Sequence, residues 1–175
     1  MSNSDVHGAL DKLTRILIDQ PEKARSKNAA ALACLREGLK CHVTGPNGEH
    51  VETDMPPTMG GTAAAPNPGW LFRASIASCG ATLIAMRAAQ LGIGLQKLEV
   101  SVTSESDHRG ILGLDKRVSA AIEELRIHVK IAADGATRAQ LLELASWAEE
   151  HSPVGCTVRQ GARSIMDVEL APAPA

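Results

Sequence analysis

The chemistry that this sequence offers centres on a thiol, Cys79, which lies inside the most apolar stretch of the chain. Other nucleophile and phosphate motifs are missing, because the sequence has no Gly-x-Ser-x-Gly, no phosphate-binding loop and no His-Glu-x-x-His. A cysteine attacks only as the thiolate, so it needs a lowered pKa or a nearby cation. Taken alone, Cys79 is more simply interpreted as an inert core residue, since free cysteine is among the most buried residue types.

Three further cysteines, Cys34, Cys41 and Cys156, complete the set without any Cys-x-x-Cys spacing. In a reducing compartment we expect free thiols rather than a disulfide framework. Zinc binding is the other common use of cysteine. The two local His–Cys pairs lack finger spacing, however: they are Cys41 with His42, and Cys156 with His151. We therefore expect no metal site.

Residues 68–91 around Cys79 predict one long helix. Asn67 can cap it, Pro68 suits its first position, and Gly92 suits its end. The apolar residues do not keep to one stripe, which is typical of a helix buried on most sides. Only residues 74–86 are free of charge, fewer than the roughly 20 that cross a bilayer. We expect a core helix and no membrane partner.

The remaining elements are predicted from the periodicity of the apolar residues and from the positions of Pro and Gly. Residues 5–37 are predicted to be helical with a break at Pro21, although the pattern leaves the state of 28–35 open. Residues 54–67, crowded with Pro and Gly, predict a loop that leads to the long helix. Alternation predicts strands at 39–43, 50–53, 98–103, 125–131 and 166–170, and helical spacing predicts helices at 137–150 and 154–160.

Strands paired as hairpins, with helices gathered on one side, give an α+β domain. We expect this domain to span residues 38–171, with an N-terminal helical extension at 1–37 and a disordered tail at 172–175.

Composition excludes some partners and suggests a compartment. The net charge is -2 and aromatic residues make up 2% of the chain, so neither a basic surface nor stacking platforms are available for nucleic acid. The first residues have no basic start and no apolar run, so we expect no signal peptide and a cytoplasmic protein.

Several segments, in order and with fitting spacing, resemble the OsmC/Ohr family from about residue 38 to residue 170. These segments are Asn67-Pro-Gly-Trp-Leu-Phe, Ala77-Ser-Cys79, Gly92-Ile-Gly-Leu, Leu98-Glu-Val-Ser-Val, Asp107-His-Arg-Gly-Ile-Leu-Gly and His151-Ser-Pro-Val. The first 37 residues look like the extension of a longer subgroup.

The resemblance implies an intertwined homodimer of α+β subunits, with antiparallel-rich sheets wrapped around long central helices and the sites at the subunit interface. Active members reduce organic hydroperoxides in oxidative-stress defence. A peroxidatic thiolate becomes a sulfenic acid, a second cysteine closes a disulfide, and an external dithiol restores the enzyme. No metal or organic cofactor is needed. Cys79 matches the peroxidatic position.

The sequence also departs from the family pattern. Ser152 stands where the family has its resolving cysteine, Gly69-Trp70 stands where a carboxylate is usual, and residues 39–43 contain only Lys40 where an arginine is expected. Arginines that could supply the cation instead are Arg73, Arg87 and Arg109.

Cys156 follows Ser152 by about one helical turn, so it is expected to face roughly the same way. It could resolve a Cys79 sulfenic acid, or it could be a packed residue of the short helix.

Two hypotheses of different classes follow. The first is a thiol-dependent hydroperoxide reductase with Cys79 as nucleophile, resolved either by Cys156 or by an outside thiol. The second is a non-catalytic homodimer of the same fold that binds a small hydrophobic ligand, which Ser152 and Gly69-Trp70 favour.

Overall fold

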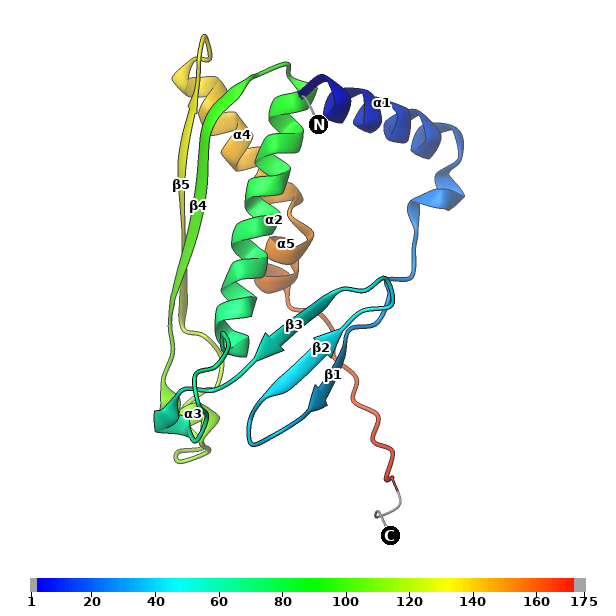
Figure 1. Cartoon of the computed structure of the whole chain (residues 1–175). Coiled ribbons are helices and arrows are strands. Elements are labelled where there is room, and N and C mark those ends of the chain that lie inside the picture. Colours follow the sequence, from blue (N-terminus) through cyan, green and yellow to red (C-terminus); the bar gives the residue numbers. More distant parts are fainter. Residues whose placement is uncertain (1–2, 172–175) are drawn as a thin grey trace.

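The computed structural model describes residues 3–171. Its helices are α1 (Asn3–Asp19), η1 (Pro21–Ala24), η2 (Pro57–Met59), α2 (Pro68–Gln90), α3 (His108–Ile111), α4 (Arg138–His151) and α5 (Pro153–Gln160). Its strands are β1 (Leu32–Leu35), β2 (Cys41–Thr44), β3 (His50–Thr53), β4 (Leu95–Glu105) and β5 (Glu124–Ala133). All strand pairs are antiparallel, which gives an α+β fold built around α2 (Figure 1).

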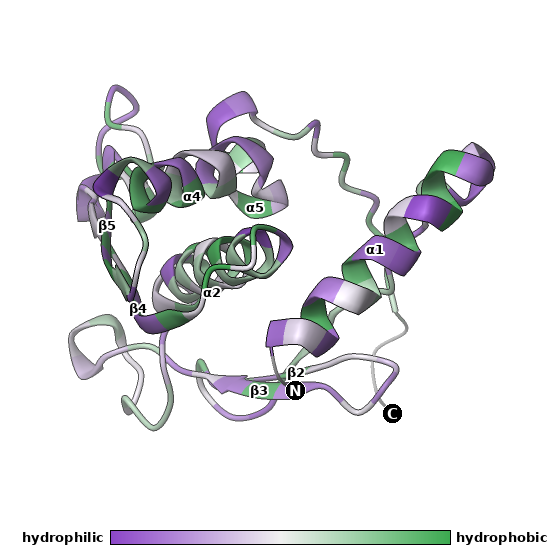
Figure 2. Cartoon of the chain, turned by 90° about the horizontal axis from the view of Figure 1, so that it is seen from above, coloured by the Kyte–Doolittle hydropathy of each residue, from purple (hydrophilic) through white to green (hydrophobic). Residues whose placement is uncertain are grey.

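The long helix α2 begins as predicted. The Asn67 side chain accepts a hydrogen bond from the Trp70 backbone N–H at 2.8 Å, and Pro68 occupies the first turn, where its missing N–H costs nothing. The expectation that α2 is buried on most sides is wrong for the single subunit. Its fully buried residues are Ile76, Ile84, Ala88 and Ala89. Figure 2 shows the reason: β4, β5, α4 and α5 cover one side of α2 and leave another side open.

The hairpin of β4 and β5 confirms the two long alternating segments. Leu98 pairs with Ile131 and Val100 with Val129, so their apolar side chains lie on one face of the hairpin. That face packs against a small core formed by residues of α2, α4 and the turn after α2: Ile84, Ala88, Ile93, Leu144 and Ala148. The core therefore lies between the hairpin, α2 and α4.

The second sheet has the strand order β1-β2-β3. Strand β1 shows that the predicted N-terminal helical extension at 1–37 includes a strand, which lies within the segment 28–35 whose state the sequence pattern left open. Leu32 to Leu35 pair with β2 through a tight turn in which Arg36 N–H donates to the Lys40 carbonyl at 2.9 Å. The predicted domain boundary at residue 37 therefore falls between β1 and the strands β2 and β3 of the same sheet. The strands of this sheet contact chiefly one another, and the sheet lies beside one end of α2 (Figure 1).

The predicted last strand at 166–170 is also wrong for the single subunit, because the described part of the tail after α5 has no strand. Its apolar side chains are exposed: 86% for Met166, 75% for Val168 and 90% for Leu170. Figure 1 shows this segment leaving α5 in extended form. A strand needs a neighbour for its backbone groups, and this subunit places none beside it. The predicted disorder at 172–175 lies outside the described residues.

Helix α1 reaches the body of the molecule at its first turns. The Asn3 side chain donates to the Ile93 carbonyl and the His7 ring contacts the Ala89 carbonyl, both at 3.1 Å. The rest of α1 extends outward (Figures 1 and 2), and none of its described residues is buried.

The loop before α2 is organised by a buried carboxylate. Asp54 is 1% exposed and accepts hydrogen bonds from the Thr62 hydroxyl and from the backbone N–H groups of Met55, Thr62 and Ala64. These donors, the Thr62 hydroxyl first, hold the pKa of Asp54 far below its usual range despite its burial. Gly61 must be glycine because a Cβ there would lie 1.8 Å from the Met55 carbonyl oxygen.

Candidate active site

Cys79 lies near the middle of α2, half-buried, on a part of the helix that meets the junction of α4 and α5. Its Sγ is 3.2 Å from the Oγ of Ser152, and either atom can be the donor. The structure thus joins the predicted nucleophile to the residue that stands at the expected resolving position. A thiol meets a hydroxyl here, so the pair can share a proton but cannot form a disulfide.

Ser152 owes its place to the turn between two helices. It ends α4 and caps α5, where its Oγ accepts the Gly155 backbone N–H at 2.9 Å. The side chain is only 4% exposed. Because one lone pair of Oγ is taken by this N–H, the hydroxyl proton remains available for Cys79. Ser152 can therefore donate to the sulfur or accept from the S–H, and it is the donor when Cys79 is a thiolate.

Cys156 has other partners than Cys79. Its Sγ donates to the Glu150 backbone carbonyl at 3.2 Å, and it accepts a hydrogen bond from Arg159 Nη2 at 3.3 Å. Both Cys79 and Cys156 are free thiols. Although Cys156 follows Ser152 by about one helical turn, its thiol does not share the Ser152 contact with Cys79. The thiol instead donates to the Glu150 carbonyl, near the end of α4.

Arg159 is a cation near the candidate site that the sequence analysis did not consider. Its guanidinium is held by the Glu149 carboxylate and by the Glu149 carbonyl, and it contacts the Cys156 sulfur. A methyl group on Gly155 would lie 3.2 Å from both Arg159 Nη1 and Ser152 Oγ, so this cation also lies near the hydroxyl that contacts Cys79. The sequence did hold a signal for this contact: Arg159 follows Cys156 by three residues, a spacing that places both side chains on one face of a helix.

The three arginines considered from sequence are engaged elsewhere. Arg73 donates to the Ser104 hydroxyl at 3.2 Å. Arg87 forms a bridge of 2.7 Å with Glu143 and lies over the Trp147 ring, 5.3 Å from its centroid. These contacts give both side chains structural roles along α2.

The third arginine, Arg109, forms an exposed pair with Asp107. Hydrogen bonds from its side chain and backbone lower the pKa of Asp107 to about 2, and Asp107 in turn raises the pKa of Arg109. Arg109 therefore serves the turn at α3.

Two hollows lie near α2. The smaller, about 30 Å³, is lined by Ile76, Gly80 and Ser152 among others, and it has room for about one water molecule. Cys79 is not one of the residues that line this hollow. The larger, about 450 Å³, lies at the start of α2 beside Arg73 and His108.

Among residues 3–171, no group of three His, Cys, Asp or Glu side chains is arranged to hold a metal ion.

The fold and the site together define an α+β protein in which a central helix presents a thiol at the junction of two further helices. The sequence profile of the OsmC-like protein family matches residues 60–166, more than half of the chain. The chain therefore belongs to the OsmC-like family. Among curated proteins, no sequence matches the chain significantly.

Solved structures share the fold at low sequence identity. An OsmC-like protein from Mycoplasma pneumoniae is similar with a TM-score of 0.66 and 18% identity, over 78% of this chain and 90% of that one. An organic hydroperoxide resistance protein from Elizabethkingia anophelis gives 0.61 and 19%, over 79% and 92%. One from Legionella pneumophila, described as a predicted redox protein, gives 0.53 and 22%, over 77% and 91%. At these identities the likeness concerns the fold.

Proposed function

We propose that this protein is a thiol-dependent reductase of organic hydroperoxides, with Cys79 as the peroxidatic nucleophile. The observation that carries the proposal is the contact of Cys79 Sγ with Ser152 Oγ, on the central helix of an OsmC-like fold. Relatives with this fold are named organic hydroperoxide resistance proteins. The Cys79 thiolate attacks one oxygen of the peroxide, the O–O bond breaks, and the products are a cysteine sulfenic acid and an alcohol.

Ser152 stabilises the thiolate in this reaction. Its hydroxyl donates to the sulfur while its oxygen accepts the Gly155 N–H, so the two hydrogen bonds form a chain that ends on the sulfur. The chain strengthens as negative charge develops on Cys79. Arg159 adds positive potential at the junction of α4 and α5, because its Nη1 and the Ser152 Oγ both lie close to Gly155.

An outside thiol completes the cycle. The sulfenic acid is attacked by a thiolate of an external dithiol, water leaves, and the second thiol of the reductant then releases Cys79. The contacts of Cys156 with Glu150 and Arg159 favour this route over direct resolution by Cys156, which would first have to break both contacts.

We further propose that the functional unit is a cytoplasmic, intertwined homodimer. The first turns of α2 expose Trp70 and Phe72, the apolar tail has no neighbour, and the three-stranded sheet makes few contacts beyond itself. Such surfaces mark interfaces. By length and composition alone, α2 is the one described helix that could span a membrane. Burial of its open side against a second subunit explains the same apolar character.

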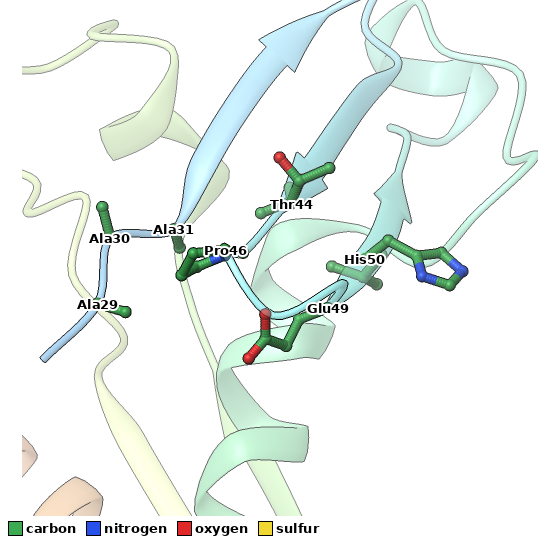
Figure 3. Close-up of a pocket in the computed structure, with 10 residues that line it drawn as sticks. Ala29, Ala30, Ala31, Thr44, Pro46, Glu49 and His50 are labelled. Atoms are coloured by element: carbon green, nitrogen blue, oxygen red, sulfur yellow. The ribbon is translucent and has the colours of Figure 1, made fainter.

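One open hollow fits this arrangement. It holds about 350 Å³ between residues 29–31 and the turn that joins β2 to β3. Figure 3 shows Ala29, Ala30 and Ala31 on one side of it and Pro46 and Glu49 on the other. An extended segment of the second subunit can be accommodated there.

The test is turnover of cumene hydroperoxide with a dithiol by the wild type, Cys79→Ser and Cys156→Ser. We expect turnover by the wild type and by Cys156→Ser, and none by Cys79→Ser. Activity that survives Cys79→Ser would place the chemistry on another residue. No turnover by the wild type would leave the second candidate function.

That second candidate is a non-catalytic member that binds a small hydrophobic molecule. The observation in its favour is the 450 Å³ hollow, whose walls include the apolar residues Met55, Met59, Ile111 and Ile122. Calorimetry with cumyl alcohol tests it. Ile122→Trp should fill the hollow and abolish binding, whereas Leu114→Trp, at an exposed position, should not.

A further inference from the structure

A second thiol lies in a row with a histidine and a carboxylate on the three-stranded sheet. Cys34 on β1 is directly opposite His42 on β2, and His42 is directly opposite Glu52 on β3. Directly opposed residues of antiparallel strands lie on one face, with Cβ atoms about 4.5–5.5 Å apart. The three side chains therefore form a continuous line across the sheet, in the order thiol, imidazole, carboxylate.

The histidine is fixed by the carboxylate. His42 Nδ1 and Glu52 Oε1 are 2.5 Å apart, so the ring and the carboxylate are joined by a hydrogen bond. With Glu52 accepting from Nδ1, the ring's other nitrogen, Nε2, is left for a different partner. This is the arrangement in which a carboxylate orients an imidazole so that it can take a proton from a nucleophile and hold the resulting charge.

The row is open to reagents. The alternation of the strands places Ala33, Val43 and Val51 on the opposite face. On the face with the row, the side chains of His42 and Glu52 are 30% and 57% exposed. Cys34 itself is exposed. Cys41 lies on the apolar face, so the two cysteines of the sheet have different surroundings.

We propose that Cys34, activated by His42 and Glu52, is a second reactive thiol that exchanges with small-molecule disulfides. The Cys34 thiol gives its proton to His42, and the thiolate attacks one sulfur of the disulfide. The disulfide S–S bond breaks, a new S–S bond joins Cys34 to half of the molecule, and the other half leaves as a thiol after taking the proton back from His42. The step needs no other reactant, and it does not involve Cys79.

The test measures the rate at which oxidised glutathione modifies Cys34 of the full chain, followed by peptide mass spectrometry at about pH 7. We expect His42→Gln to slow this modification by about tenfold and Glu52→Gln to slow it several-fold. His50→Gln is the matched control. His50 lies in the neighbouring row, opposite Thr44, so its loss should leave the rate unchanged.

Two results would overturn the proposal. One is a Cys34 rate equal to that of the unfolded chain at the same pH. The other is an equal loss in His42→Gln and His50→Gln, which would indicate a general effect of the sheet. Far-ultraviolet circular dichroism and the melting temperature of each variant show whether the sheet is intact. If a variant has lost the sheet, its rate is not compared with that of the wild type. Instead, the rate at which oxidised glutathione modifies Cys34 of the wild type is measured between pH 5 and 8. A rate that follows the titration of one ordinary thiol counts against the proposal.

Discussion

At Cys79 the sulfur meets a hydroxyl where the family resemblance led us to expect a second thiol. Ser152 is held by the turn between α4 and α5, and its oxygen is fixed by the Gly155 N–H. The same position therefore brings whichever side chain it carries to Cys79. What Ser152 removes is only the capacity to form a disulfide, and not the hydrogen bond that stabilises the thiolate.

Ser152→Cys should restore an internal disulfide. The Sγ–Oγ distance of 3.2 Å exceeds an S–S bond of about 2.05 Å by an amount that small side-chain rotations can close. We expect one equivalent of cumene hydroperoxide to produce a Cys79–residue 152 linkage, detected by mass spectrometry of the non-reduced protein. Cys156→Ser serves as the background for this variant. A stable sulfenic acid on Cys79 with no linkage would show that the two side chains do not meet.

Arg159 acts on Cys156 directly. Its guanidinium donates a hydrogen bond to the sulfur, so a cation lies beside the atom that reacts with an alkylating agent. Arg159→Gln should slow the alkylation of Cys156 by iodoacetamide several-fold at about pH 7. Arg163→Gln, in the tail, is the control. Equal rates in the wild type and Arg159→Gln would mean that the contact does not matter for reactivity.

At the scale of elements, the loop before α2 depends on one carboxylate. Asp54 satisfies three backbone N–H groups and one hydroxyl in a loop that contains one short 3-10 helix, η2. The loop ends at Asn67, which starts α2, so the Asp54 contacts help to place the helix that carries Cys79.

Asp54→Asn should lower the melting temperature at neutral pH, because an amide cannot replace the charged acceptor and its NH2 group would face other donors. The pKa of Asp54 is lowered in the folded state, so its contribution is present above the unfolded value of about 3.9 and is lost as pH falls through the folded value. The gap in stability between wild type and variant should therefore shrink in acid. Thermal melts from pH 7 to 2 measure it. A gap that is constant with pH would contradict this account, and Asp19→Asn is the exposed control.

Sequence reasoning predicted the elements whose signals are local. The cap at Asn67, the proline at position 68 and the alternation in β4 and β5 all act within a few residues, and each element formed where it was expected. It left open a segment whose state is decided by pairing with another strand. Residues 32–35 lie in an Ala-rich segment, and their pairing with β2 made them a strand.

The site divides in the same way. The family resemblance singled out Cys79, but the sequence could not choose its cation, because Arg73, Arg87 and Arg109 are taken by Ser104, Glu143 and Asp107. Those partners come from elsewhere in the fold or from local turns whose geometry spacing does not fix.

For the whole molecule, the exposed apolar surfaces indicate that one subunit is incomplete. The open side of α2 and the apolar tail would each be costly to leave in water. The tail keeps the alternation of a strand at Met166, Val168 and Leu170, which the single subunit does not use.

Val168→Asp should weaken the proposed homodimer, because it places a charge on the face that the alternation assigns to packing. We expect sedimentation at micromolar concentration to give a dimer for the wild type and a shift toward monomer for the variant. Glu169→Gln, on the opposite face of the same segment, should sediment as the wild type does. A wild-type monomer would contradict the assembly and leave the open side of α2 without an explanation.

The central claim is that the Cys79 sulfur is the atom that peroxide oxidises. Its most direct measurement is the trapping of a sulfenic acid with dimedone, after one equivalent of cumene hydroperoxide is added to the Cys156→Ser protein. The account predicts a dimedone adduct on Cys79, located by peptide mass spectrometry, together with stoichiometric cumyl alcohol. Consumption of the peroxide without an adduct on Cys79, or an adduct confined to another cysteine, would contradict it.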